Sequence, residues 1–200
     1  FVRGYYQDSM GKTGVNDRRM YDDAVFIVSP DGVANYNGNS DPGVYRRRVA
    51  TIKGNQAIRY KPGIHGLTRA KSRQYRAFRQ DENTTVIRDQ MGEDYGYFGV
   101  NLHRGGVNSV NSLGCLTIPP HQWDEFHGHL NAMLRKFGQE TFYVTLAEYA
   151  GDNPPVEIKT VDVVQGAPKV EDAVILGVGG LITWLWVKWE TFSSCVGGLF

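Results

Sequence analysis

The chain has 200 residues, of which 41% are hydrophobic and 22% are charged, a composition typical of an ordinary globular protein. This length is enough for one well-buried domain with an appendage, and it excludes two large domains. The 22 basic and 21 acidic residues give a net charge of +1, which argues against a nucleic-acid-binding protein, because such proteins usually carry a clear basic surplus on one face.

Basic residues are concentrated in the first half of the chain, in the run Arg46–Arg48 and between Arg69 and Arg79. Two interpretations remain open for them. They either form solvated strand and loop faces, or they create a weakly basic face that attracts an anionic polymer or a membrane.

The two cysteines, Cys115 and Cys195, lie in chemically unlike surroundings. A fold held by disulfides normally has more cysteines at denser spacing, so no disulfide framework is expected, although a single Cys115–Cys195 bridge remains open. Residues 1–4 show neither the charged segment nor the apolar run of a signal peptide.

Short β-strands are predicted over the first 60 residues. The clearest covers residues 24–28, which are apolar and are followed by a strong turn signal at residues 29–32. Residues 35–43 are rich in Asn, Gly, Asp and Pro and are expected to form a loop. Two more strands are expected at residues 49–52 and 57–60.

The next segments are less regular. Residues 75–80 are expected to hold one helical turn, and residues 84–88 a strand. Residues 97–103 are predicted to form another strand, because Phe98, Val100 and Leu102 alternate with other residues along it.

One helix is much clearer than the other elements, and it covers about residues 120–137. Pro119 and Pro120 stand where a helix can begin, and Gly138 ends the pattern. The apolar residues recur at spacings of three and four, which places them on one helix face: Trp123, Phe126, Leu130, Met133, Leu134 and Phe137.

The segment 141–149 alternates between apolar and polar residues and is predicted to be a strand. Residues 1–150 are therefore expected to form one mainly-β or α+β domain with one main helix. A break at residues 151–155 opens a linker over 151–172. Residues 173–200 are predicted to form a hydrophobic C-terminal helix, which is either a membrane anchor or a buried or oligomerising helix.

The chemically informative residues are His103 and Cys115. A predicted strand delivers His103 to its end, a polar loop containing glycines follows, and Cys115 comes directly after Gly114. A thiol becomes a good nucleophile when a nearby imidazole takes its proton. The small residues beside the cysteine leave room for a substrate carbonyl and leave backbone N–H groups to hold an oxyanion.

This stretch resembles the active-site motif of the L,D-transpeptidase (YkuD-like) catalytic domain, in which a His at a strand end is followed by Ser-x-Gly-Cys and an aliphatic residue. The matching residues are His103, Ser112, Gly114, Cys115 and Leu116. The match covers roughly residues 98–120, and it implies the β-sandwich-like fold of that family. The wider sequence resembles a phage and prophage branch of the family, in the segments 10–12, 16–18 and 21–24, in His103-Arg104-Gly105-Gly106 and in Ile118-Pro119-Pro120.

The chain departs from the family pattern in two ways. The His-to-Cys spacing is shorter than usual, and Thr117 stands where family members usually carry a substrate-recognising Arg. Arg104 could supply that charge instead. His65 lies in a tight turn that could border the substrate groove, and a structural role in the turn is the competing interpretation.

The resemblance implies that His103 takes the proton of Cys115 and that the thiolate attacks a carbonyl in a peptidoglycan stem peptide. The N–H groups of Cys115 and Gly114 would hold the oxyanion, and Ser112 would orient the loop. No cofactor is implied. A phage protein has more use for breaking the wall than for making it, so hydrolysis is favoured over cross-linking.

The expected location is a phage virion or the bacterial cell envelope, facing the wall, with residues 173–200 as a membrane anchor or as a contact with a virion partner. The alternative function is a non-catalytic virion or envelope structural protein that retains the fold. A zinc site is not expected, because the spacing of His121, His127 and His129 fits no familiar ligand set.

Overall fold

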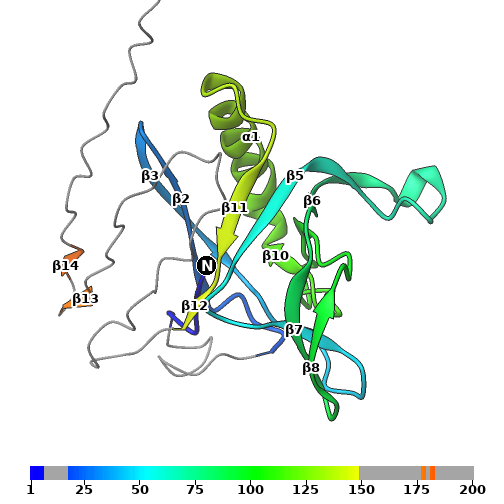
Figure 1. The fold of residues 1–200 in the computed structure, drawn as a ribbon. Coiled ribbons are helices and arrows are strands. Elements are labelled where there is room, and N and C mark those ends of the chain that lie inside the picture. Colours follow the sequence, from blue (N-terminus) through cyan, green and yellow to red (C-terminus); the bar gives the residue numbers. More distant parts are fainter. Residues whose placement is uncertain (7–17, 149–176, 179–180, 183–200) are drawn as a thin grey trace, which may run out of the picture. The chain divides into compact units, whose positions relative to one another are not determined.

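A computed structural model describes residues 1–6, 18–148, 177–178 and 181–182, and it is drawn as a ribbon in Figure 1. The chain divides into two compact units, Phe1–Gly151 and Asp152–Phe200. The described part is mainly β with one α-helix, as the sequence predicts.

Most strands of the first unit are short, and tight turns join several of them, such as β2 to β3 and β7 to β8. They are β1 Val2–Arg3, β2 Asp23–Ser29, β3 Gly32–Gly38, β4 Ala50–Ile52, β5 Ala57–His65, β6 Tyr75–Gln80, β7 Thr84–Arg88, β8 Gly92–Gly96, β9 Leu102–Arg104, β10 Leu116–Ile118, β11 Phe142–Thr145 and β12 Ala147–Glu148. The helix α1 covers Pro120–Lys136, and a 3-10 turn, η1, covers Lys71–Arg73.

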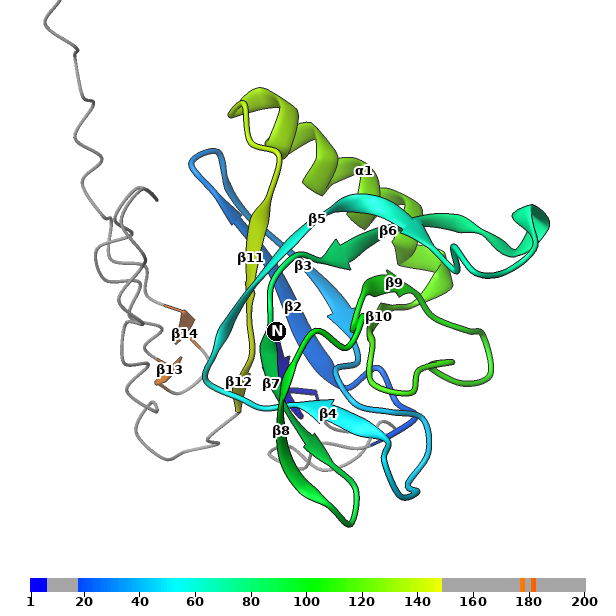
Figure 2. The same ribbon diagram turned by 45° about the vertical axis from the view of Figure 1, so that its right-hand side comes forward.

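These strands form three sheets in the order β12-β1-β2-β3, β10-β9-β6-β5-β11 and β4-β7-β8. A single antiparallel bridge between Asn39 and Thr117 connects the end of β3 to β10, so the first two sheets meet there. The hairpin β5–β6 extends outward and carries η1 at its tip (Figure 2).

Two sequence predictions are wrong in this region. Residues 35–38 are not loop but the end of β3, which pairs with β2 along its whole length; Tyr36 is buried there and its ring lies edge-on to Phe126 at 5.2 Å. Residues 75–80 are not a helical turn but β6, which pairs with β5 from His65–Tyr75 to Tyr60–Gln80. Cross-strand pairing overrides weak local preferences in both cases.

The predicted strand 97–103 is also shorter than expected, because only Leu102–Arg104 is strand. Gly99 adopts a positive φ of 69°, which interrupts an extended backbone. The N–H of Val100 is donated to the side-chain oxygen of Gln80 at 3.0 Å instead of to a neighbouring strand.

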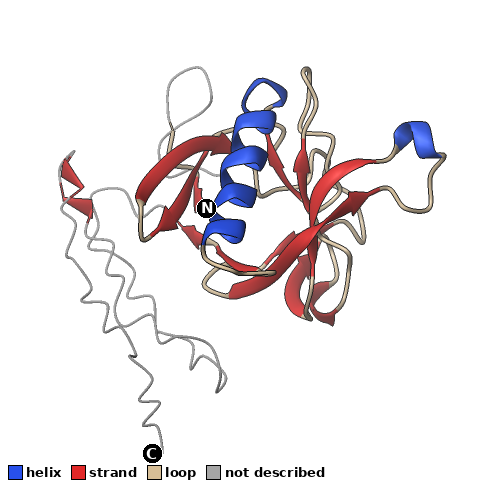
Figure 3. Cartoon of the chain, turned by 90° about the horizontal axis from the view of Figure 1, so that it is seen from above, coloured by secondary structure: helices blue, strands red, loops and turns tan. Residues whose placement is uncertain are grey.

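The predicted helix is confirmed. Pro120 is its first residue, and Arg135 and Lys136 lie in its last turn, where cations suit the helix dipole. Trp123, Phe126, Leu130 and Leu134 are buried, whereas Met133 and Phe137 are only partly buried. The view in Figure 3 shows the helix beside the strands of the first unit, away from η1.

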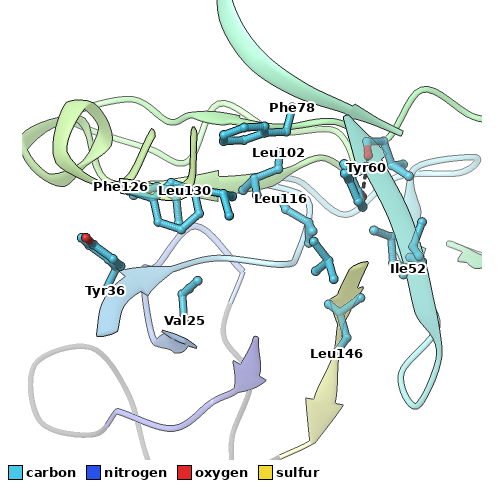
Figure 4. Close-up of a cluster of buried hydrophobic side chains, with 14 of the residues drawn as sticks. Val25, Tyr36, Ile52, Tyr60, Phe78, Leu102, Leu116, Phe126, Leu130 and Leu146 are labelled. Atoms are coloured by element: carbon cyan, nitrogen blue, oxygen red, sulfur yellow. Dashed lines mark hydrogen bonds between the residues drawn. The ribbon is translucent and has the colours of Figure 1, made fainter. Parts of the chain in front are cut away.

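One hydrophobic core collects side chains from all three sheets and from α1 (Figure 4). Val25 and Tyr36 come from β2 and β3, and Ile52 comes from β4. The five-stranded sheet supplies the largest share: Ile58, Tyr60, Phe78, Leu102, Leu116, Ile118 and Val144. This core fixes which face of the five-stranded sheet points inward.

The second unit gives no support for the predicted C-terminal helix. Gly177–Val178 and Leu181–Ile182 are described as two short antiparallel strands, β13 and β14. The rest of the helix predicted over 173–200, the linker 151–172 and Cys195 lie outside the described residues. Among the described residues, no helix combines the length and apolar character that crossing a membrane requires.

Candidate functional site

The candidate site is built on the adjacent parallel strands β9 and β10. Leu102 pairs with Leu116 and His103 with Thr117, so Cys115, one residue before β10, lies beside Asn101. Leu102 and Leu116 face the core, and successive side chains alternate between sheet faces. His103 and Cys115 therefore lie on the same, outer face of the sheet.

The β5–β6 hairpin adds two aromatic side chains to this outer face. His65 is opposite Tyr75, and Tyr75 lies on the same face as His103. The ring centres of His65 and His103 are 4.2 Å apart, and the ring centres of His65 and Tyr75 are 5.2 Å apart. The Asn101 amide lies 3.4 Å from His65 Nδ1. The site thus collects side chains from β5, β6 and β9 and from the residues directly before β9 and β10.

The His103 imidazole is buried, with an exposed fraction of 2%. Its Nδ1 lies 2.8 Å from the carbonyl oxygen of Arg104 and 3.1 Å from the Tyr75 hydroxyl. A carbonyl can only accept, so Nδ1 carries the proton and donates it, which leaves Nε2 as the acceptor. Burial, followed by the charges of His65 and Arg69, lowers the pKa of His103 to about 4, against the effect of the Arg104 hydrogen bond.

The Cys115 side chain is a partly buried, free thiol. Its Sγ donates weakly to the carbonyl of Gly99 at 3.8 Å. Burial raises the pKa of Cys115 to about 11, although the backbone N–H of Asn101 and the charge of Arg69 favour the thiolate. No hydrogen bond joins this thiol to His103 within the described residues.

The resting pair is therefore neutral. Burial raises the pKa of the thiol and lowers the pKa of the imidazole, so both shifts disfavour proton transfer from Cys115 to His103 in the free protein. A substrate that changes the surroundings or the geometry of the pair is required before the thiol becomes a strong nucleophile.

Ser112 and Gly114 shape the turn that presents Cys115. The Ser112 hydroxyl donates to the Cys115 carbonyl at 2.6 Å and accepts from the Gly114 N–H at 3.0 Å. The Gly114 N–H is thus already used, so of the two expected oxyanion donors only the Cys115 N–H remains. Gly114 has φ 140°, and a Cβ on it would lie 2.4 Å from the Ala50 carbonyl oxygen.

The connection between the two strands is anchored away from the thiol. The Tyr21 hydroxyl donates to the Gly106 carbonyl at 2.8 Å, and the Gly106 N–H donates to the Ser109 carbonyl at 3.0 Å. A Cβ on Gly106 would lie 2.5 Å from that Ser109 oxygen, so the close approach requires glycine. The Gly43 N–H also donates to the Ser112 carbonyl at 2.8 Å.

The remaining predicted residues occupy different positions. Arg104 is exposed, and its guanidinium carbon lies 5.6 Å from the centre of the Tyr75 ring, at the edge of the cluster. Thr117 is fully buried beside His103, and its Oγ1 has no hydrogen-bond partner within the described residues. The predicted tight turn at His65 is wrong, because His65 is the last residue of β5 and pairs with Tyr75, and its ring belongs to the cluster.

Three further residues of the site, Tyr75, Asn101 and Arg69, are not indicated by the sequence motif. The local sequence predicts a helical turn at Tyr75, which gives its side chain no defined direction, whereas Tyr75 lies in β6. The strand alternation of β6 would have placed it opposite His65. Strand alternation would also have placed Asn101, two residues before His103, on the same sheet face as His103. Nothing in the sequence connects Arg69 to the site, because a long loop side chain has no fixed direction.

No match was found when the chain was compared with protein-family models, curated proteins and solved structures. The likeness to the L,D-transpeptidase motif therefore rests on the residues themselves. Within the described residues, no group of three or more His, Cys, Asp or Glu side chains is placed to hold a metal ion.

Proposed function

We propose that this chain is a cysteine enzyme that acts on peptide bonds of peptidoglycan stem peptides through Cys115 and His103. One observation carries the proposal. The thiol and the imidazole lie on one sheet face of neighbouring strands, and the Arg104 carbonyl fixes the imidazole so that Nε2 is left as the base. The motif resemblance supplies the substrate class.

The reaction would begin when substrate closes the gap between the two groups. His103 Nε2 takes the thiol proton, and Sγ forms a bond to the carbonyl carbon, with the Cys115 N–H donating to the oxyanion. The tetrahedral intermediate collapses as the imidazolium gives its proton to the leaving amine and the C–N bond breaks. A thioester on Cys115 remains.

Water or an amine then attacks the thioester, and His103 takes a proton from that nucleophile and returns one to the departing sulfur. Water gives hydrolysis and an amine gives transpeptidation. We favour hydrolysis, as part of wall lysis or penetration by a phage virion or at the cell envelope. That preference rests on the resemblance to the phage branch.

Mass spectrometry of purified peptidoglycan fragments tests the proposal. The fragments are incubated with the wild type, with Cys115→Ala and with His103→Asn. We expect the wild type to remove a residue, open a cross-link or exchange an amino acid, and both variants to lose that activity by at least about a hundredfold. Equal activity of wild type and Cys115→Ala would refute a cysteine mechanism.

A second candidate is a non-catalytic virion or envelope protein that retains this architecture. The neutral resting pair favours it, because a thiol with a pKa of about 11 and no hydrogen bond to the imidazole is also what an inert buried cysteine shows. Under this candidate, no fragment changes in the mass-spectrometric assay, and wall binding is unaffected by Cys115→Ala.

A further inference from the structure

Two arginine side chains, Arg69 and Arg104, flank the cluster of His65, Tyr75 and His103 and come from different elements. The aliphatic part of Arg69 lies over Gly66, since a Cβ there would be 3.2 Å from Arg69 Cδ, and Gly66 directly follows His65. The Gln74 side chain donates to the carbonyls of Arg69 at 2.9 Å and Leu67 at 3.3 Å, which holds this turn together. Arg104 approaches from β9, over the Tyr75 ring.

Neither guanidinium is neutralised by an acidic side chain in the part of the chain that the structure describes. Within the described residues, Arg69 and Arg104 take part in no ion pair. Residues 42–80 contain 11 Lys and Arg residues and not one Asp or Glu. Four of these basic residues, Lys53, Arg59, Lys61 and Arg76, pair with acidic side chains outside the segment, whereas Arg69 makes no such pair within the described residues.

The charge of Arg69 is felt throughout the cluster. Burial is the largest influence on all three pKa values, lowering those of His65 and His103 and raising that of Cys115, and the charge of Arg69 acts beside it toward a lower pKa in each. Two other arginines of the hairpin are engaged differently: Arg76 faces Asp124 at 3.4 Å, and Arg79 donates to the Ile64 carbonyl at 3.1 Å. Arg69 is thus the hairpin cation that acts directly on the reacting groups.

We propose that Arg69 and Arg104 bind a carboxylate of the substrate beside the carbonyl that Cys115 attacks. The inference rests on the proposed function and specifies its substrate: a peptide whose reacting segment carries a free carboxylate. A guanidinium donates two parallel N–H bonds to a carboxylate, so binding there also orients the substrate. A carboxamide at the same position offers only one neutral acceptor oxygen and no negative charge, so it binds the two arginines less strongly.

The binding test uses the full chain with Cys115→Ala, so that nothing is turned over. Calorimetry compares a stem peptide bearing free carboxylates with the same peptide amidated. We expect the free-carboxylate peptide to bind at least about tenfold more tightly, and Arg69→Gln or Arg104→Gln to remove that difference. The matched control, Arg73→Gln, lies on the same hairpin in η1 and should keep it. Equal binding of both peptides would overturn the inference.

A second measurement needs no peptide. The imidazole signals of His65 are followed by NMR against pH, with and without acetate. His65 faces His103, Tyr75, Asn101, Arg69 and Arg79. Acetate should raise the pKa of His65 by cancelling positive charge, and Arg69→Gln should abolish that response while Arg73→Gln keeps it. An unchanged His65 titration refutes an anion site, and stronger binding of inorganic phosphate than acetate refutes a carboxylate site.

The two proposals fail separately. An acetate response at His65 without any change in peptidoglycan fragments would leave the anion site and remove the enzymatic function. Turnover of free and amidated peptides at equal rates would leave the enzyme and remove the role of Arg69 and Arg104.

Discussion

Gly114 is the residue at which backbone and packing constraints coincide. It needs a positive φ, and a side chain on it would collide with the Ala50 carbonyl oxygen at 2.4 Å. We expect Gly114→Ala to lower the free energy of unfolding by about 3 kcal/mol or more. Urea denaturation measures this. The control is Gly128→Ala on α1, where nothing lies within 4 Å and a gain of up to about 1 kcal/mol is expected. Equal effects would contradict the clash.

The thiol of Cys115 should be slow to react in the free protein. With a pKa of about 11, its thiolate fraction at pH 7 is about a hundredfold smaller than that of an unfolded cysteine. Iodoacetamide alkylation, followed by mass spectrometry, should therefore accelerate up to about pH 11 in the folded chain. In urea it should level off near the ordinary cysteine pKa. Fast alkylation of the folded chain at pH 7 would show that an ion pair already exists.

His103 should make the free energy of unfolding depend on pH in the acidic range. Its pKa is about 4 in the folded chain against 6.5 for an ordinary histidine, so the unfolded chain binds more protons between these values. Stability from this group is complete above about pH 6.5 and falls by up to about 3 kcal/mol as the pH drops to 4. Asp23, whose pKa is raised to about 6, has the opposite slope in an overlapping range.

The variant His103→Asn separates these effects, because Asp23 is present in both chains. Urea denaturation at pH 7 and pH 4 should show the wild type losing up to about 3 kcal/mol more than the variant. If wild type and variant lost the same stability between pH 7 and pH 4, His103 would have to be protonated in the folded chain at pH 4.

Among the elements, β5 is tied to the chain entering β9 by one buried hydrogen bond. The Tyr60 hydroxyl donates to the Val100 carbonyl at 2.7 Å (Figure 4). Tyr60→Phe leaves that carbonyl without a partner, so we expect a loss of about 1–2 kcal/mol in thermal or urea unfolding. Tyr95→Phe, at a tyrosine that is 69% exposed, should change stability by less than about 0.5 kcal/mol. A neutral Tyr60→Phe would indicate that water replaces the hydroxyl.

Elements with a strong local pattern could be predicted, and elements that depend on distant partners could not. The helix 120–136 and the strands at 24–28 and 84–88 carry clear periodicity or turn signals. Strand β6 carries charged residues on both of its faces, so its sequence does not show the alternation of a strand. Only its pairing with β5 identifies it as a strand. The same holds for the site: the His103–Cys115 motif is local, whereas the approach of Tyr75 and Arg69 follows from the hairpin.

The near-neutral net charge of the chain conceals an uneven distribution of basic and acidic residues along it. Residues 42–80 hold 11 of the 22 basic residues and none of the 21 acidic ones. The rest of the chain is therefore acidic overall. A total of +1 excludes a generally basic protein, but it gives no information about one basic segment beside the candidate site.

The buried residues of the described hydrophobic core lie between Val25 and Leu146, and Phe1 packs against them. A chain ending at Gly151 should therefore unfold cooperatively, with a midpoint close to that of the full chain. Circular dichroism during heating measures both. Loss of the cooperative transition would show that residues beyond 151 complete the folded unit.

The connection between β9 and β10 has a consequence for adaptation. Its tip, Val107–Asn108, is exposed, with Val107 86% accessible, while Tyr21 holds one end through Gly106 and Ser112 holds the other. Lengthening such a tip costs little, because loop-closure entropy rises slowly with length. Residues inserted there would leave the hydrogen bonds of Tyr21 and Ser112 in place, so this tip is where the chain should tolerate added length without displacing the turn that presents the thiol.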